Sequence, residues 1–160
     1  MELFKEYLIP WIGSNVIAII LLISAIKKPT LARLLFALLF GWACWINYTT
    51  VHNTPEVYLD YASLTPFVCL RDFINGWFKD HIIQMVTLIS VGQGLIAIGM
   101  ILKGWLVRIA CIGAIVFLLA IVPLGIGAGF PFSIITAIAL YFILKRDNLD
   151  YLWNYKAKRT

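Results

Sequence analysis

The two histidines of the chain are the side chains best suited to chemistry. His52 closes one apolar segment and His81 opens the next, with 28 residues between them. The same boundary carries three carboxylates, Glu56, Asp72 and Asp80. An imidazole can ligate a metal or haem iron, or exchange a proton with a reduced quinone. If the two apolar segments form a helical hairpin, both imidazoles lie at one face of it and are able to share a ligand.

A simpler interpretation of the histidines stays open, in which both are solvated residues at the edge of a membrane. The sequence contains no HxxxH or HExxH motif and no carboxylate–histidine run with metal-ligand spacing, so we predict no metal site. Cys44, Cys69 and Cys111 stand far apart without a CxxC pair, which disfavours dithiol chemistry. The cofactor is therefore undetermined, with a quinone favoured over haem.

Gln93 is the third candidate, because it lies near the middle of an apolar run. An unpaired amide at that depth costs several kcal/mol, so the side chain needs a partner on a neighbouring helix or on a ligand. Ser90 and Gly94 form a small-xxx-small pair that allows another helix to approach closely. Both an interhelical contact and a quinone or substrate contact fit this position.

The composition indicates whether water or lipid surrounds these residues. Hydrophobic residues make up 62% of the 160 residues and charged residues 13%. Soluble domains contain about 45–50% hydrophobic and about 25% charged residues. A domain of this size has too little interior to hide such a sequence from water. We therefore predict an all-α integral membrane bundle in contact with the lipid bilayer. No nucleic-acid-binding module is present, so we expect no nucleic-acid partner.

Five crossings account for the apolar segments, because a helix needs about 20 apolar residues to span the hydrocarbon core. A charge-free run of 36 residues, Ile109–Leu144, is too long for one crossing and contains prolines and glycines that turn the backbone. We divide it there. The predicted membrane-spanning helices comprise residues 8–26, 31–50, 82–102, 103–123 and 129–146.

The basic residues set the orientation. Five crossings place ten of the thirteen lysines and arginines on one face and three, Lys5, Arg71 and Lys79, on the other. Cytoplasmic loops carry the excess of lysine and arginine, so we predict the amino terminus outside and the carboxyl terminus in the cytoplasm. The ten on the cytoplasmic face are Lys27, Lys28, Arg33, Lys103, Arg108, Lys145, Arg146, Lys156, Lys158 and Arg159.

The long outer loop is predicted to contain an amphipathic interfacial helix at residues 66–79. Thr65-Pro66 is a favourable helix start, with a capping hydroxyl before a proline. At helical spacing one face is apolar and the opposite face carries Arg71 and Lys79. This helix is either a lid over the outer mouth of the bundle or an interfacial anchor. Its apolar face consists of Leu70, Phe73, Ile74, Trp77 and Phe78.

Three stretches together resemble the DoxX-like family of small bacterial membrane proteins, which includes the DoxD-type subunit of thiosulfate:quinone oxidoreductase. They are ARLLFALLFGWACW (Ala32–Trp45), LRDFINGWFKDHI (Leu70–Ile82) and GQGLIAIGMILKGWLVRIACIGA (Gly92–Ala114). The resemblance covers about Ala32 to Lys145, four of the five predicted spans. It implies a four-helix core, and the first helix of this chain is additional to it.

Within the loop stretch, Arg71, Phe73 and Gly76 stand where that family has its aromatic-Arg-x-Phe-x-x-Gly motif, and Leu70 replaces the aromatic residue. Gln93 stands where the family often has a glutamate, which argues against a role that needs a carboxylate there.

The resemblance implies a multi-pass protein of the bacterial cytoplasmic membrane that forms the quinone-facing subunit of an oxidoreductase. Its ligand-binding candidates are His52, His81, Arg71, Asp80 and Gln93. The alternative is a non-catalytic accessory or scaffold subunit packed against other membrane proteins. Whether the chain is itself an enzyme is left open by these residues.

Overall fold

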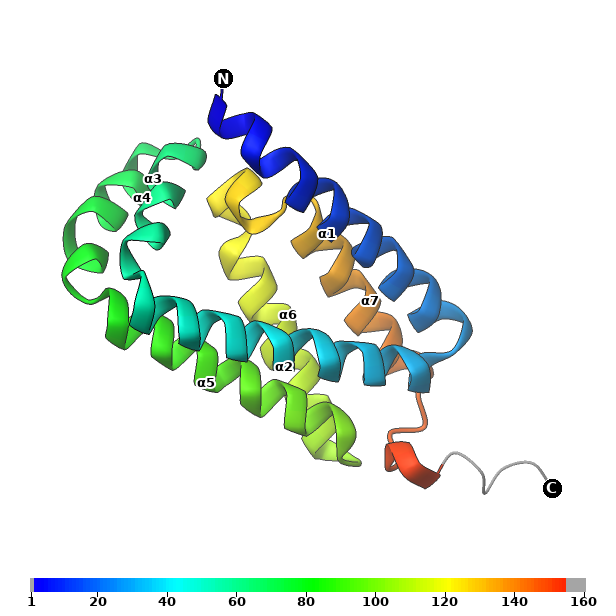
Figure 1. Ribbon diagram of the computed structural model, residues 1–160. Helices are drawn as coiled ribbons and strands as arrows, with labels where there is room; N and C mark the ends of the chain where they lie inside the picture. Colours follow the sequence, from blue (N-terminus) through cyan, green and yellow to red (C-terminus); the bar gives the residue numbers. More distant parts are fainter. Residues whose placement is uncertain (1, 155–160) are drawn as a thin grey trace.

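The structure is a computed structural model that describes residues 2–154, with side chains from Leu8 onward. In that part of the chain every regular element is helical, as the sequence predicts. Five long helices form the bundle (Figure 1). They are α1 (Glu2–Lys27), α2 (Pro29–Asn53), α5 (Ile82–Ile101), α6 (Trp105–Ile121) and α7 (Phe132–Arg146).

Among the described residues, four segments are long and apolar enough to cross a membrane: Leu8–Lys27, Pro29–Asn53, Ile82–Ile101 and Trp105–Ala128. The last one consists of α6 and the 3-10 helix η3 (Val122–Ala128). With 15 residues, α7 spans about 22 Å at 1.5 Å per residue, less than the hydrocarbon thickness of about 30 Å. The structure thus bears out four of the five predicted spans by length and composition.

The helices pack as two pairs, α2 along α5 and α1 along α7, and α6 contacts both α5 and α7. Figure 1 shows the pairs meeting where α1 turns into α2 and spreading apart towards the opposite end. The main apolar core lies between α1, α2, α6 and α7, around residues such as Phe36, Phe40, Leu118 and Leu140.

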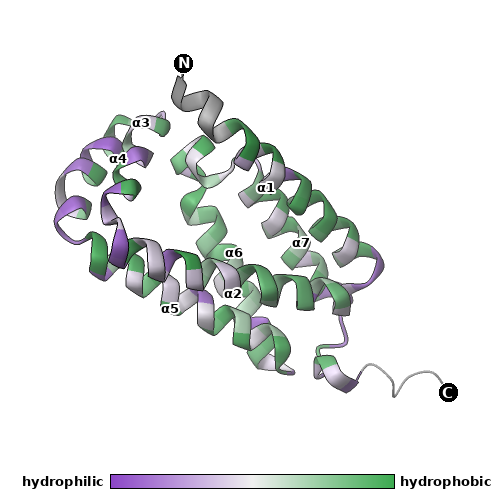
Figure 2. Cartoon of the chain, in the orientation of Figure 1, coloured by the Kyte–Doolittle hydropathy of each residue, from purple (hydrophilic) through white to green (hydrophobic). Residues whose placement is uncertain are grey.

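The outer surfaces of the long helices are apolar. Ile9 is 80% exposed and Leu95 66% exposed, and many other aliphatic side chains point away from the core. Figure 2 shows mostly hydrophobic residues along α1, α6 and α7, and hydrophilic residues gathered in the α3–α4 region and at the α1–α2 turn. Water does not stabilise so extended an apolar surface, which indicates contact with a lipid bilayer.

The loop between α2 and α5 folds into short helical pieces at the open end of the bundle. These are η1 (Pro55–Asp60), α3 (Tyr61–Leu64), α4 (Val68–Phe73) and the π-helix η2 (Ile74–Phe78). We call this segment, residues 54–81, the cap. Its α3 contacts η3, and η1 contacts both α2 and α5.

The predicted helix at 66–79 starts later than expected. The Thr65 hydroxyl donates to the Pro123 carbonyl at 2.8 Å and accepts from the Phe67 N–H at 3.3 Å, so it ties the cap to η3 instead of capping a helix at Pro66. Helix α4 then begins at Val68. A backbone break at Gly76 (φ −102°, ψ −110°) interrupts the helical stretch.

The predicted apolar face of this helix is divided in the structure. Ile74 is 3% exposed, and Phe78 packs against a buried cluster that includes Val51 and Ile82. Phe73 and Trp77 instead stack on each other and point outward, 42% and 51% exposed. The cap is therefore anchored to the bundle along one side and presents aromatic rings on the other.

Candidate functional site

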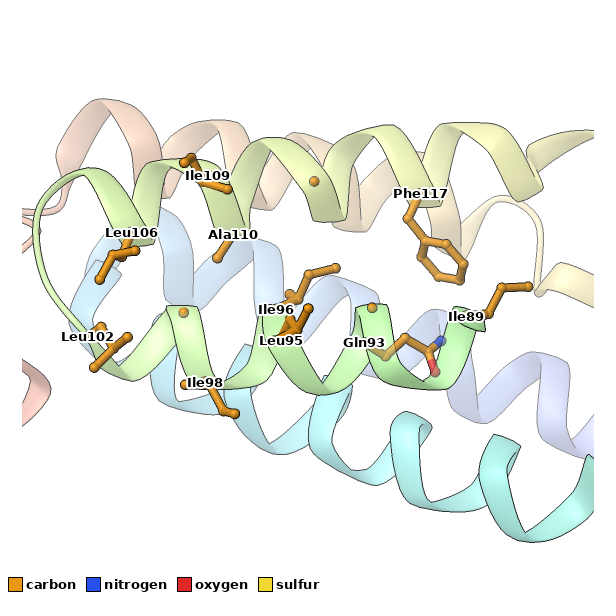
Figure 3. A pocket seen from close by; sticks show the side chains of 13 residues that line it. Ile89, Gln93, Leu95, Ile96, Ile98, Leu102, Leu106, Ile109, Ala110 and Phe117 are labelled. Carbon is orange, nitrogen blue, oxygen red and sulfur yellow. The ribbon is translucent and has the colours of Figure 1, made fainter. Parts of the chain in front are cut away.

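A groove of about 510 Å³ runs between α5 and α6 on the outer side of the bundle (Figure 3). This volume lies within the range of small-molecule sites, about 300–1,000 Å³. Its walls are almost entirely aliphatic, with Phe117 near one end and Leu102 and Leu106 at the other. Leu95 and Ile98 on its rim are exposed, so the groove opens towards the surroundings of the bundle.

Small residues create the groove and also fix its depth. A Cβ added at Gly92 or Gly113 would meet no atom within 4 Å, so both positions leave open space. A Cβ at Gly99 would lie 2.6 Å from the Ala110 Cβ, which shows that α5 and α6 are in contact there. One glycine thus permits the close crossing of the helices, and two others hollow out the surface beside it.

Gln93 supplies the amide of this groove and is only 5% exposed. Its Oε1 accepts a hydrogen bond of 2.9 Å from the Nδ2 of Asn47 on α2. The Tyr58 hydroxyl in η1 donates in turn to Asn47 Oδ1 at 2.9 Å. We call these three residues the polar relay. In Figure 3 the Gln93 nitrogen lies on the side of α6 and its oxygen on the side of α2.

The relay determines which end of each amide is a donor. Burial raises the pKa of Tyr58 above its usual value of 10.0, opposed by a weaker effect of a hydrogen bond with Thr50, so its hydroxyl keeps its proton at neutral pH. That proton is donated to the Asn47 oxygen, which leaves the Asn47 amino group to donate to Gln93. Within the described residues the Gln93 side chain forms its hydrogen bond through Oε1, and its Nε2 lies on the side of α6, towards the groove.

The position of Gln93 along α5 places this donor deep in the bundle. It lies eleven residues after Ile82, a rise of about 16 Å, which is half the thickness of a hydrocarbon core of about 30 Å. The site therefore offers one hydrogen-bond donor near the middle of α5 to a molecule that is otherwise held by aliphatic contacts.

Close packing of α2 against α5 makes the relay possible. A Cβ on Gly94 would lie 3.2 Å from the Sγ of Cys44, as the small-xxx-small pair predicts. Ser90, the other member of that pair, is buried and donates to the Val86 carbonyl at 2.8 Å. The interhelical partner predicted for Gln93 is thus Asn47.

Each of the two histidines lies within hydrogen-bond distance of a backbone carbonyl four residues earlier in the chain. His52 Nδ1 lies 2.8 Å from the Tyr48 carbonyl and its ring centroid is 4.3 Å from that of Tyr48. His81 Nδ1 lies 2.8 Å from the Trp77 carbonyl, with ring centroids 4.3 Å apart. No hydrogen bond or ring contact joins the two imidazoles in the described part of the chain.

Arg71 and Asp80 lie on the cap, away from the groove. Arg71 Nε donates to the Ala62 carbonyl at 3.3 Å and borders a shallow polar cleft of about 450 Å³ with Asp60 and Asn75. Asp80 is exposed. Among residues 2–154 no three histidine, cysteine or acidic side chains are grouped so that they could hold a metal ion.

Sequence reasoning missed Asn47 and Tyr58 as site residues, and it treated Arg33 as a surface charge. Arg33 is completely buried and its Nη1 forms a 2.8 Å ion pair with Asp147. A signal for this pair did exist, because Asp147 directly follows the last predicted span, 129–146, on the same predicted face as Arg33. Asn47 was likewise visible as a polar residue within an apolar run.

The chain matches no known family model, no curated protein and no solved structure.

Proposed function

We propose that this chain is the membrane-embedded, quinone-facing subunit of an oxidoreductase. The observation that carries the proposal is the apolar groove between α5 and α6, with the Gln93 Nε2 as its hydrogen-bond donor. A quinone fits such a site chemically, because its ring carbonyls accept hydrogen bonds while its ring and tail are apolar.

The depth of Gln93 favours a quinone over an ordinary phospholipid. Phospholipid ester carbonyls lie near the membrane interface, about 15 Å from the midplane of a core about 30 Å thick. A molecule that dissolves wholly in the hydrocarbon carries its carbonyls to the midplane and can approach Gln93 directly. Burying that carbonyl without a donor is unfavourable, so one hydrogen bond at this depth both holds and orients the ring.

We further propose five crossings in a bacterial cytoplasmic membrane, with α7 as the fifth and the amino terminus outside. Two carbonyls of the connection between α6 and α7 accept hydrogen bonds from side chains of α1, which is favourable where water is scarce. Trp11 Nε1 donates to the Phe130 carbonyl at 2.6 Å, and Asn15 Nδ2 donates to the Gly129 carbonyl at 3.2 Å. The ten-to-three distribution of basic residues supports this orientation.

Filling the groove tests ligand binding. The probe is decylubiquinone, titrated into the purified protein in lipid nanodiscs. Gly113→Leu places a side chain in open space within the groove, and we expect it to weaken binding at least about tenfold, because it occupies the volume of the ring. Gly13→Leu is the matched control, since a Cβ on Gly13 also meets no atom within 4 Å but lies on α1. Equal affinities of the two variants, or no binding by the unaltered protein, contradict the proposal.

The oxidoreductase part of the proposal is tested on native membranes. His52, His81, Arg71 and Asp80 lie at the proposed outer face, where reduced sulfur compounds such as thiosulfate would arrive. We expect thiosulfate-dependent quinone reduction by the native complex to fall when both histidines are replaced by alanine. Unchanged reduction in that double variant contradicts a role for the imidazoles.

A second candidate function is a non-catalytic accessory subunit of a larger membrane complex. Exposed tryptophans favour it: Trp42, Trp45 and Trp105 all point outward from the bundle, and tryptophan is enriched in protein interfaces. Gentle detergent extraction distinguishes the candidates. An accessory subunit copurifies with defined partners and without quinone, whereas copurified quinone supports the first candidate.

A further inference from the structure

We infer that Tyr58 is a positioning residue that makes the groove selective for the oxidised quinone over the quinol. This inference rests on the proposed quinone-binding function and adds to it a preference for one redox form. It follows from the direction of the hydrogen bonds in the polar relay, which joins the cap to the middle of the bundle.

The relay has a single donor direction from the cap to the groove. The Tyr58 hydroxyl, which donates to Asn47 Oδ1 at 2.9 Å, also lies 3.3 Å from the Asn47 backbone carbonyl oxygen, so this donor is directed at oxygen atoms of Asn47. The Asn47 amino group then holds Gln93 Oε1 at 2.9 Å on the side of α2. The amino group of Gln93 is consequently the part of its amide that is presented to the groove.

The packing of Tyr58 keeps this arrangement in place. Its side chain is 9% exposed and belongs to a buried cluster with Val51, Ile82 and Val86. These residues come from α2 and α5, the same helices that carry Asn47 and Gln93. The hydroxyl is therefore held by the cap at a fixed position relative to both amides.

A donor without an accompanying acceptor distinguishes the two redox forms. A quinone carbonyl only accepts, so it pairs fully with Gln93 Nε2. A quinol hydroxyl can accept the same hydrogen bond, but its own proton then lies in an aliphatic groove without an acceptor. Leaving one buried donor unpaired is enough for about a tenfold preference, which corresponds to about 1.4 kcal/mol.

Such selectivity favours binding of the oxidised quinone and release of the quinol. The oxidised quinone binds from the bilayer, and the reduced product is bound less tightly and leaves more readily. Because the groove stabilises the oxidised form by binding it more tightly, the midpoint potential of the bound quinone is lower than that of the free quinone.

The experiment compares decylubiquinone and decylubiquinol on the full chain in nanodiscs. We expect the unaltered protein to bind the quinone about tenfold more tightly and to lower its two-electron midpoint potential by about 30 mV. Tyr58→Phe removes only the hydroxyl, which frees the Asn47 and Gln93 amides to rotate. We expect both the preference and the potential shift to disappear in this variant.

Two further variants show whether Tyr58 acts through the relay. Tyr48→Phe is the matched control, since it removes the hydroxyl of an exposed tyrosine on α2 and should keep the preference. In a Gln93→Leu background, the Tyr58→Phe change should have no additional effect on selectivity. Asn47→Leu should abolish the preference as Tyr58→Phe does, and provides the test if the latter variant does not fold.

The outcomes separate the two proposals. If the unaltered protein binds neither form, the proposed function fails. If it binds both forms equally, or if Tyr58→Phe and Asn47→Leu retain the tenfold preference in folded protein, the selectivity inference fails while quinone binding stands. Thermal melting of each variant establishes that it is folded.

Discussion

The Nη1 atom of Arg33 lies 2.8 Å from the Oδ1 atom of Asp147, and both side chains are completely buried. The same guanidinium donates to the carbonyls of Met100 at 2.9–3.0 Å, of Leu102 at 2.6 Å and of Asp150 at 2.7 Å. One side chain thus joins the start of α2, the end of α5 and the segment after α7. This contact closes the end of the bundle at which the two helix pairs meet.

Replacing Asp147 should strongly destabilise the protein. Asp147→Asn leaves the Arg33 charge buried without a counter-charge, and breaking a buried pair from one side costs about 3–5 kcal/mol. We expect a clear fall in melting temperature in detergent. Asp150→Asn is the control, because Asp150 is exposed and bonds to Arg33 only through its backbone carbonyl. Equal melting temperatures of the two variants would argue against a stabilising ion pair between Arg33 and Asp147.

The contact of α5 with α6 should be sensitive to one methyl group. In Gly99→Ala the new Cβ lies 2.6 Å from the Ala110 Cβ and 3.3 Å from the Leu106 carbonyl oxygen, so the helices must separate. Overpacking of this kind costs about 1–3 kcal/mol. Gly113→Ala on α6 meets open space and should be neutral or stabilising by up to about 1 kcal/mol through helix propensity. Denaturant unfolding in detergent measures the free energy of unfolding of both variants. Similar free energies for Gly99→Ala and Gly113→Ala would disprove the close contact.

Tyr58 should make stability fall in alkaline solution. Its pKa is raised by burial, so above the usual value of 10.0 the unfolded chain releases the proton before the folded protein does. Its contribution is therefore complete below pH 10 and is lost as the pH rises towards the higher folded pKa. Tyr58→Phe should flatten this part of the dependence. Melting temperatures measured across this range should differ in slope between the two proteins; parallel curves would contradict the assignment.

The native cysteines report the orientation of the chain. Cys69 on the cap is exposed, Cys44 is partly buried within α2 and Cys111 is buried in α6. In intact cells, a membrane-impermeant maleimide should therefore label Cys69 alone, and Cys69→Ser should abolish labelling. Labelling that requires permeabilised cells would place the cap in the cytoplasm and invert the proposed topology.

The long helices were predictable because their signal is local. The predicted segment 82–102 corresponds to α5 (Ile82–Ile101), and 31–50 lies within α2 (Pro29–Asn53). Apolar runs of this length have one stable state in lipid, since a helix satisfies its own backbone hydrogen bonds there. The prolines and glycines before Phe132 likewise marked the division between α6 and α7.

The cap was predicted less well because its helix signals compete with long-range contacts. Thr65 has the chemistry of a helix cap, yet its hydroxyl bonds to Pro123, 58 residues away. The predicted apolar face is divided because Ile74 packs inward, while Phe73 and Trp77 point outward. Helical periodicity places side chains on a face but does not specify which neighbours that face will meet.

By itself the sequence determined that lipid surrounds the protein, where its long helices form and that Gln93 needs a partner. Each of these follows from the transfer of apolar and polar groups between water and lipid, which depends on local composition. Only the tertiary structure decided that the partner is Asn47, that Arg33 is buried against Asp147, and that α5 and α6 leave a groove beside their crossing. These features depend on which helix faces meet, and the meeting faces are chosen by close packing between residues far apart in the chain.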